Sequence, residues 1–249
     1  MKKHIPNILT LLNLFFGCCA LVCIFSTEFD QALIFLILSG ICDFSDGMAA
    51  RMLNIKSEFG KEVDSLADMV SFGVVPGAIV YMMLVLIVEV DAIGYYTPTA
   101  FSQYIFKMHP EALPAFIISA FSCYRLAKFN LDARQSQDFI GLNTPANTLF
   151  FLGLLFAAKN NTFGLGQTIL SANFLYALIP ISSYLLISEI PMFSFKLKGF
   201  VWKGNEIQFI FVALSIALII LLKSAGLAFI VALYVLINIL LLWVKPKTN

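Results

Sequence analysis

Residues 43–68 read DFSDGMAARMLNIKSEFGKEVDSLAD and form the densest cluster of charged side chains in the chain. An apolar run, residues 31–42, precedes this stretch, and a second apolar run, residues 69–88, follows it. Near its centre, residues 54–57 include an asparagine and a serine, which favour turns over continued helix. The sequence therefore predicts two apolar helices whose charged ends meet at a short turn.

The whole chain has the composition of a membrane protein. Hydrophobic residues make up 60% of its 249 residues and charged residues only 12%, against about 45–50% and 25% in soluble globular domains. A soluble fold of this length could not bury so much apolar surface, so we expect lipid to be the solvent for much of it. The net charge of +1 gives no sign of a nucleic-acid partner.

Eight segments have the length and apolar character of membrane-crossing helices, which need about 20 mostly apolar residues. The predicted fold class is therefore an all-α membrane protein, a polytopic helical bundle with six core transmembrane helices and two further C-terminal spans. The predicted spans are residues 8–25, 31–53, 60–90, 111–130, 145–158, 171–190, 208–222 and 225–244.

The placement of positive charges predicts how these spans are oriented. Lysine and arginine gather in loops on the cytoplasmic side of a membrane. With eight spans and the N-terminus inside, all but three of the 16 lysines and arginines fall on the inner side, the exceptions being Lys107, Lys159 and Lys223. We therefore expect both termini and residues 43–68 on the cytoplasmic side of a bacterial or archaeal cytoplasmic membrane.

Four aspartates in this stretch are spaced so that their side chains converge. Asp43 and Asp46 are three residues apart, and Asp64 and Asp68 are four apart, so each pair shares one helix face. In an antiparallel hairpin the four carboxylates would repel one another strongly. Arg51 alone cannot balance them, so we expect a divalent cation. Oxygen ligands suit Mg²⁺, Mn²⁺ or Ca²⁺, and paired ions of this kind recur in phosphoryl chemistry.

Three small residues, Gly47, Ala50 and Gly60, stand between these aspartates. Small side chains leave room for a bulky ligand to approach the backbone, although in membrane helices they also serve close helix packing. Next to four acidic side chains, the ligand-binding interpretation is favoured.

Eight residues of the stretch fit the pattern D-x2-D-G-x2-A-R-x8-G-x3-D-x3-D, which resembles the signature of the CDP-alcohol phosphotransferase family. Eight positions at fixed spacing are a specific match. Residues 71–77, 125–130 and 141–146 are similar to the phosphatidylserine synthase branch of that family, although Asn143 stands where many members have proline. The signature residues are Asp43, Asp46, Gly47, Ala50, Arg51, Gly60, Asp64 and Asp68.

The resemblance, which covers about residues 5–190, implies a transmembrane core in residues 1–190, with residues 191–249 as an extension that holds two spans. It also implies a homodimer and an enzyme that transfers the phosphatidyl group of CDP-diacylglycerol to the hydroxyl of L-serine. The products would be phosphatidylserine and CMP, formed by direct displacement with the help of one or two Mg²⁺ or Mn²⁺ ions.

The same resemblance implies roles for individual residues. Asp43, Asp46, Asp64 and Asp68 would bind the metal, and Asp68 would also act as the general base. The CDP-lipid side of the site would consist of Asn7, Thr10, Gly47, Ala50, Arg51, Gly60 and Asp64. The acceptor side would consist of Arg125, Lys128, Asn130 and Thr144, since the two cations are three residues apart at an inner helix end and suit a carboxylate or a phosphate.

Two other functions stay open from the sequence alone. The same signature serves transferases whose acceptor is glycerol 3-phosphate or inositol phosphate, and Arg125 with Lys128 does not exclude such an acceptor. A cation transporter could use the four aspartates as an ion path. Transporters usually show repeated halves, whereas this chain has one acidic cluster without a second copy.

Overall fold

The computed structural model describes residues 4–55, 57–93, 108–132, 139–193 and 205–244. The N-terminal half contains α1 (Ile5–Phe25), α2 (Phe29–Met52), α3 (Glu58–Asp68), η2 (Met69–Val74), α4 (Val75–Ile93), η3 (Pro110–Phe116) and α6 (Ile117–Leu131). The C-terminal half contains β1 (Phe139–Ile140), α7 (Thr144–Lys159), η5 (Thr162–Gly164), α8 (Gly166–Ile169), α9 (Ala172–Ile187), β2 (Pro191–Met192), α10 (Glu206–Leu222), η6 (Lys223–Ala225) and α11 (Gly226–Val244).

Five helical stretches of the described chain are long and apolar enough to cross a membrane, so the protein is an all-α integral membrane protein, as predicted. They are Ile5–Phe25, Phe29–Met52, Glu58–Val88, Pro110–Leu131 and Glu206–Leu242. The last of these reverses direction at η6 and is a hairpin of α10 and α11.

Helices also form at the two shorter predicted spans, residues 145–158 and 171–190. Both α7 and α9 have 16 residues. At 1.5 Å per residue each is about 24 Å long, which is less than the roughly 30 Å of hydrocarbon in a typical bilayer.

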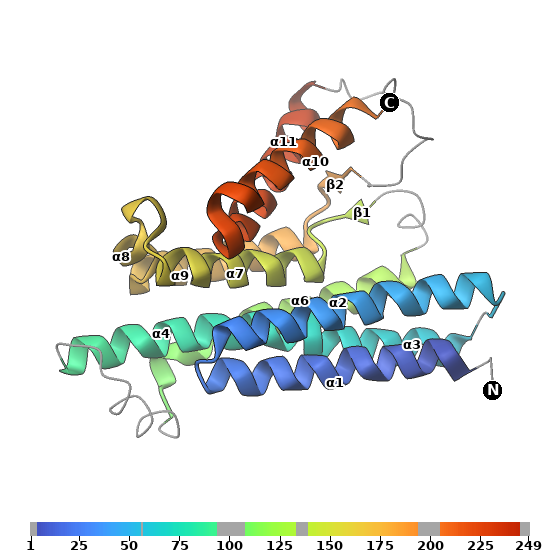
Figure 1. Cartoon of the computed structure of the whole chain (residues 1–249), viewed down its shortest axis with the longest axis horizontal. Coiled ribbons are helices and arrows are strands. Elements are labelled where there is room, and N and C mark those ends of the chain that lie inside the picture. Colours follow the sequence, from blue (N-terminus) through green and yellow to red (C-terminus); the bar gives the residue numbers. More distant parts are fainter. Residues whose placement is uncertain (1–3, 56, 94–107, 133–138, 194–204, 245–249) are drawn as a thin grey trace.

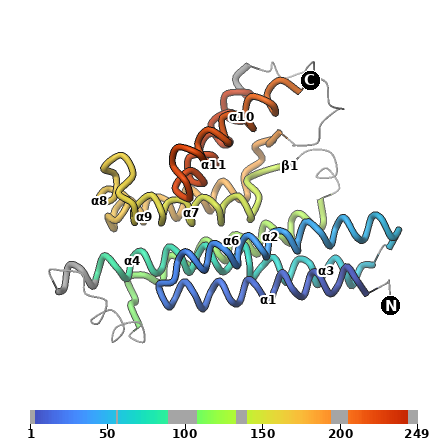
Figure 2. Tube along the Cα trace, viewed as in Figure 1, coloured from blue at the N-terminus to red at the C-terminus, as the bar shows by residue number. Residues whose placement is uncertain are grey.

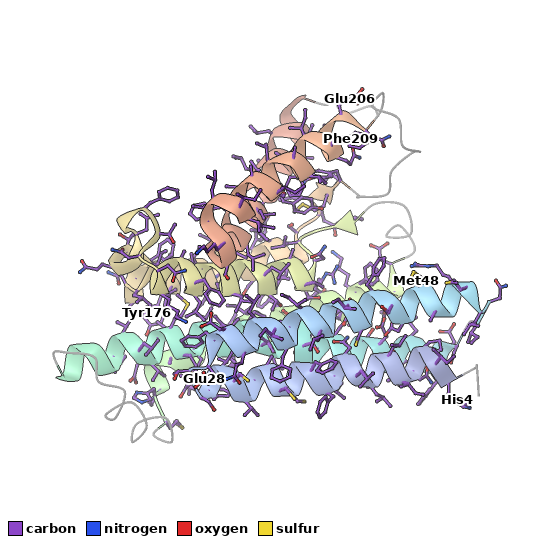
Figure 3. The ribbon with its side chains drawn as sticks, viewed as in Figure 1. His4, Glu28, Met48, Tyr176, Glu206 and Phe209 are labelled. Carbon is purple, nitrogen blue, oxygen red and sulfur yellow. The ribbon has the colours of Figure 1, made fainter. Side chains whose placement is uncertain are left out.

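The helices pack as a bundle with one hairpin leaning on it (Figure 1). α1 packs along α2, α4 lies between α1, α6 and α7, and α9 packs against α6. The α10–α11 hairpin contacts the bundle through α7. The start of α1, the end of α2 and α3 lie together at one end of the bundle, here named the acidic end, and α8 lies at the other (Figure 2). His4 and Met48 mark the acidic end, whereas Glu28 lies near the opposite end of the same helices (Figure 3).

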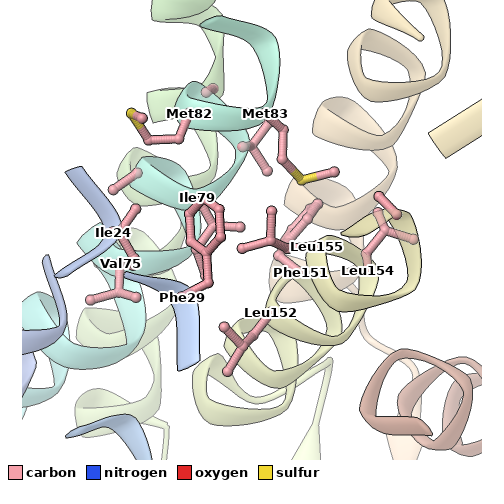
Figure 4. Packing of buried hydrophobic residues seen from close by; sticks show 14 of the residues in the cluster. Ile24, Phe29, Val75, Ile79, Met82, Met83, Phe151, Leu152, Leu154 and Leu155 are labelled. Carbon is pink, nitrogen blue, oxygen red and sulfur yellow. The ribbon is translucent and has the colours of Figure 1, made fainter. Parts of the chain in front are cut away.

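The hydrophobic core lies around α4, where α1, α2, α7 and α9 meet. Fully buried side chains include Ile24, Val75, Ile79, Phe151 and Leu152 (Figure 4). Residues 75–88 are apolar on every side of the helix, which is the pattern of a helix surrounded by others. The central position of α4 therefore follows from its sequence.

A π-helical segment, η2, joins α3 to α4 without a break in the helix. It begins directly after Asp68, and its residues Ser71, Phe72 and Gly73 are buried. Short π-helical segments are rare inside helices and frequent next to functional sites. The amphipathic α3 and the wholly apolar α4 thus form one continuous helix, whose winding changes locally at η2.

The hairpin contacts α7 at a glycine. A Cβ atom at Gly153 would overlap the backbone of Leu227 and Ala228 on α11. In contrast, a Cβ atom at Gly40 on α2 would meet nothing within 4 Å. The absence of a side chain at Gly153 is therefore what lets α7 and α11 approach so closely.

We expect Gly153→Leu to lower the free energy of unfolding by at least the 1–3 kcal/mol, roughly, that overpacking costs. The thermal unfolding midpoint in detergent should fall by about 2–4 °C for each kcal/mol. Gly40→Leu adds the same side chain where space is open and should leave the midpoint unchanged. Equal midpoints for the two variants would contradict the contact.

Candidate active site at the acidic end

Three of the four predicted aspartates converge where α2 and α3 meet. One carboxylate oxygen of each of Asp43, Asp64 and Asp68 lies within 4.8 Å of the other two. Asp43 lies on α2 and the other two on α3, so the convergence depends on the helical hairpin that residues 43–68 predict. The prediction of a short turn between two helices with facing carboxylates is confirmed for these three residues.

Asp46 is oriented differently from the other three aspartates. Its Oδ2 atom accepts a hydrogen bond of 2.6 Å from the hydroxyl of Thr10 on α1. Both side chains are buried. Asp46 is not part of the 4.8 Å group found among the described residues; it holds α1 against α2 beside that group.

Asn13 supports the cluster from α1 and was missed from the sequence. Its Nδ2 atom donates to Oδ1 of Asp68 at 3.0 Å. The Ser39 hydroxyl donates to Asn13 Oδ1 at 2.5 Å, and the Ser71 hydroxyl donates to its backbone carbonyl at 3.1 Å. Asn13 is completely buried. A lone asparagine within an apolar span, three residues after Thr10, is the signal that could have identified it.

The donor set of this cluster fits a divalent cation. Oδ1 of Asp64 is buried and has no hydrogen-bond partner in the part of the chain that the structure describes. A buried carboxylate oxygen without a partner is costly unless a cation or donor reaches it. Three converging carboxylates offer only oxygen ligands, which Mg²⁺ and Mn²⁺ prefer.

A pocket of about 220 Å³ opens beside the carboxylates, between the starts of α1 and α3 and the end of α2. It has room for a ligand several times larger than a water molecule, whose share of liquid volume is about 30 Å³. Six of the residues predicted for the CDP-lipid side line it. The lining consists of Pro6, Asn7, Thr10, Asp46, Gly47, Ala50, Ile55, Ser57, Gly60, Lys61 and Asp64.

Two features keep this pocket open. A Cβ atom at Gly47 would meet nothing within 4 Å, and one at Gly60 would lie 3.3 Å from Oδ1 of Asn7. The Ser57 side chain accepts a hydrogen bond from the Gly60 backbone N–H at 3.0 Å, which caps α3 at its first turn. Arg51, the seventh predicted residue, is exposed in the last turn of α2 and does not line the pocket.

On the predicted acceptor side, the structure brings Arg125 and Thr144 together. Arg125 Nη1 donates to Thr144 Oγ1 at 3.4 Å, and the guanidinium carbon lies 5.2 Å from the centre of the Phe129 ring. Arg125 is only 6% exposed, and its Nε has no partner among the described residues. It also lies within electrostatic range of Asp68. A buried guanidinium with an unused donor, close to the carboxylates, is suited to an anionic ligand.

Lys128 and Asn130 have different surroundings. Lys128 forms an ion pair with Glu189, with 2.5 Å between Nζ and Oε1. Asn130 Nδ2 donates to the Ser65 hydroxyl at 2.7 Å, and Lys61 Nζ donates to the Asn130 carbonyl at 2.8 Å. Asn130 therefore ties the end of α6 to α3 beside the acidic cluster, whereas the charge of Lys128 is balanced by Glu189.

Comparison with known proteins gives a consistent result. A family model described as CDP-alcohol phosphatidyltransferase matches residues 3–245. The CDP-diacylglycerol–serine O-phosphatidyltransferase of Bacillus subtilis is 31% identical over 194 residues, which cover 78% of this chain and 92% of the relative. The Helicobacter pylori (strain ATCC 700392 / 26695) protein of the same name is 29% identical over 237 residues, covering 94% and 89%. The Saccharomyces cerevisiae protein is 34% identical over 172 residues, covering 63% and 55%.

Proposed function

Because the chain belongs to the CDP-alcohol phosphatidyltransferase family, we propose that it transfers the phosphatidyl group of CDP-diacylglycerol to the hydroxyl of L-serine. The products are phosphatidylserine and CMP. The observation that carries this proposal is the group of three carboxylates beside a pocket at one end of a bundle of apolar helices. The names of the relatives, which specify CDP-diacylglycerol and serine, support the donor and the acceptor.

In this proposal the pocket holds the cytidine part of the donor. Asn7, Thr10 and Asp64 supply polar contacts, and Gly47, Ala50 and Gly60 leave the space that the base and ribose occupy. Arg51 does not line the pocket; it directly follows Ala50, and its exposed side chain is proposed to contact the donor from outside the pocket. The diphosphate then lies between the pocket and the three converging carboxylates.

Asp43, Asp64 and Asp68 would hold Mg²⁺ or Mn²⁺, with Asp46 as the fourth proposed ligand. When bound, one or two such ions supply positive charge that neutralises the diphosphate oxygens and stabilises the departing CMP. The chain itself contributes the alignment of these carboxylates, since Thr10 fixes Asp46 and Asn13 fixes Asp68.

Asp68 is the proposed general base. Asn13 donates to Oδ1 of Asp68, so the carboxylate orientation is set from α1 while Oδ2 can accept the serine hydroxyl proton. The serine oxygen forms a bond to the lipid-side phosphorus, and the bond between that phosphorus and the bridging oxygen of CMP breaks. Alignment and charge neutralisation account for most of the rate in such phosphoryl transfers.

Arg125 is the proposed partner of the serine carboxylate, and Thr144 accepts a hydrogen bond from one of its nitrogens. Asn130, which ties α6 to α3, is proposed to add a hydrogen bond to serine. Glu189 balances the charge of Lys128, so Arg125 is the buried cation without a carboxylate partner on this side of the described chain. One such cation suits a singly charged carboxylate better than a doubly charged phosphate. This observation favours serine over glycerol 3-phosphate or inositol phosphate.

We further propose that the acidic end and both termini face the cytoplasm of a bacterial or archaeal cell. In this arrangement eight helices cross the membrane, six in a core of residues 1–190 and two in the extension of residues 191–249, and two copies of the chain form a homodimer. The support is the distribution of lysine and arginine over the loops and the family to which the chain belongs.

The test is CMP release by the purified full-length protein in detergent with CDP-diacylglycerol and Mg²⁺ or Mn²⁺. L-Serine, glycerol 3-phosphate and inositol phosphate are each supplied as the sole acceptor, and we expect release with serine alone. Release with a different acceptor would reject serine and keep phosphatidyl transfer. If no acceptor supports CMP release and the protein conducts cations in proteoliposomes, the enzymatic function is rejected and a cation transporter is favoured.

The pocket assignment predicts the effect of filling it from α2. Gly47→Leu projects a side chain into the open space and should raise the KM for CDP-diacylglycerol about tenfold or more, which corresponds to about 1.4 kcal/mol of lost binding. Gly40→Leu lies on the same helix, also in open space, but outside the pocket. We expect this control to keep the KM of the unmodified protein. The same KM in both variants would place the nucleotide elsewhere.

A further inference from the structure

Two side chains of the C-terminal hairpin bind the backbone N–H and carbonyl of one residue, Phe193. The Tyr234 hydroxyl donates to the carbonyl of Phe193 at 2.9 Å, and Asn238 Oδ1 accepts from the N–H of Phe193 at 2.7 Å. Asn238 Nδ2 donates to the Tyr234 carbonyl at 2.7 Å, which fixes the orientation of the amide. Tyr234 and Asn238 are 5% and 1% exposed. Both polar groups of the Phe193 backbone are therefore bound by α11. The two side chains that bind them, Tyr234 and Asn238, are four residues apart and share one helix face.

Aromatic packing strengthens the same contact. The Phe193 ring lies 4.9 Å from the Tyr234 ring and 5.6 Å from the Phe211 ring of α10, both edge-on. Phe211 and Tyr234 lie 5.7 Å apart. We name Phe193 with Phe211, Tyr234 and Asn238 the Phe193 clamp. In an apolar environment, leaving a backbone N–H and carbonyl without partners would cost several kcal/mol. The arrangement in which Tyr234 and Asn238 bind the Phe193 backbone is therefore strongly favoured.

Phe193 directly follows β2, which the clamp therefore anchors. β2 pairs with β1 antiparallel, with Met192 opposite Phe139. The Gly141 N–H donates to the Ile190 carbonyl at 2.9 Å. Gly141 has φ +75°, and a Cβ atom there would lie 2.8 Å from the Ser188 carbonyl oxygen, so only glycine fits this left-handed position. Residues 139–142 are thus fixed on residues 185–193.

The residues that contact the acceptor-side cations lie within or directly beside these two segments. Asn143 follows directly and caps α7, its side chain accepting from the Ala146 N–H at 2.8 Å. Thr144, the next residue, accepts from Arg125. From the other segment, Glu189 pairs with Lys128. The hairpin is therefore linked to both cations through the β1–β2 pairing.

We infer that Tyr234 and Asn238 are positioning residues for the acceptor, and that the hairpin sets the place of Thr144 and Glu189 and through them of Arg125 and Lys128. This inference rests on the proposed function for the identity of the acceptor side. It gives the last two helices a part in catalysis although neither contributes a residue to the acidic cluster or to the pocket beside it.

The kinetic test compares Tyr234→Phe and Asn238→Leu with Ser215→Ala in the full-length protein. Ser215 lies on α10 in the same hairpin, and its hydroxyl donates at 2.8 Å to Phe211 within its own helix. The control thus also loses one hydroxyl hydrogen bond, but one that does not reach residue 193. We expect the KM for serine to rise about fivefold in Tyr234→Phe, which loses one hydrogen bond, and by more in Asn238→Leu, which loses two. The KM for CDP-diacylglycerol should stay unchanged. Asn238→Gln, which keeps the amide, should recover part of the loss.

Hydrogen–deuterium exchange by mass spectrometry tests the clamp without any substrate. Peptides that contain residues 139–142 and 188–193 should exchange faster in Tyr234→Phe and Asn238→Leu, and at the unmodified rate in Ser215→Ala. Unchanged exchange in the clamp variants would overturn the inference, as would an equal rise of both KM values or a fall of kcat alone. If the unmodified protein uses another acceptor, the proposed function fails in its serine part, and the split between the two KM values is measured with that acceptor instead.

Discussion

Replacement of Asp68 by asparagine is expected to lower kcat for CMP release about a thousandfold or more. Loss of a general base costs about 10²–10⁴ in rate, and the same change removes one of three converging carboxylates. Asparagine has nearly the same shape and keeps an oxygen that can accept from Asn13, so the fold should persist. The measurement is kcat at saturating serine and CDP-diacylglycerol, with the thermal midpoint as a check of folding.

Asp30→Asn is the matched control for this experiment. Asp30 lies in the first turn of α2, forms an ion pair of 2.7 Å with Lys159 at the far end of the bundle, and is 74% exposed in its side chain. An exposed pair of this kind contributes little to stability, and we expect full activity. Residual activity in Asp68→Asn within tenfold of the unmodified protein would show that another group accepts the proton.

Removal of divalent cations should abolish CMP release, and Mg²⁺ or Mn²⁺ should restore it. We expect Asp43→Asn to raise the concentration of Mn²⁺ needed for half-maximal binding at least about tenfold, because even partners of the ligands change metal affinity by about 10–100-fold. Electron paramagnetic resonance of Mn²⁺ measures binding directly, and the recovery of activity on titration measures its effect.

Glu62→Gln serves as the control for the metal experiment. Glu62 is an exposed carboxylate on α3, the helix that carries Asp64 and Asp68, and it lies outside the group of three. Its replacement should leave Mn²⁺ binding unchanged. Equal binding of Mn²⁺ by the unmodified protein and by Asp43→Asn would show that the metal does not bind at this cluster.

The helix faces of the acidic cluster could be predicted because helical periodicity alone sets them. A spacing of three or four residues puts Asp64 and Asp68 on one side whatever surrounds the helix. Their partners could not be predicted in the same way. Asn13 meets Asp68 only because of the rotation of α1 against α3, which depends on the packing of the whole bundle. Asn13 was visible as a polar residue in an apolar span, but its contact was not.

The acceptor side shows a second reason why part of the site was missed. Arg125 and Lys128 share a helix face, as their spacing predicts, yet Glu189 pairs with Lys128 alone. Glu189 lies within the predicted span of residues 171–190, but α9 ends at Ile187, so that span was predicted too long and Glu189 falls in the irregular segment before β2. Contacts between such segments, some 50 residues apart, are decided by tertiary packing and leave no pattern in the sequence.

The π-helical segment after Asp68 has a consequence for how insertions and deletions are tolerated. In π-helical winding the backbone hydrogen bond joins residues i and i+5 instead of i and i+4, so a π-helical turn holds about one residue more than an α-helical turn. Removing one residue from Met69–Val74 would let the segment return to α-helical winding, and Asp64 and Asp68 would keep nearly the same direction relative to α4. Adding one residue would instead turn both aspartates by about 100° away from α2 while the apolar side chains of α4 kept their places. The segment is thus a spacer between a polar and an apolar repeat that tolerates a deletion better than an insertion.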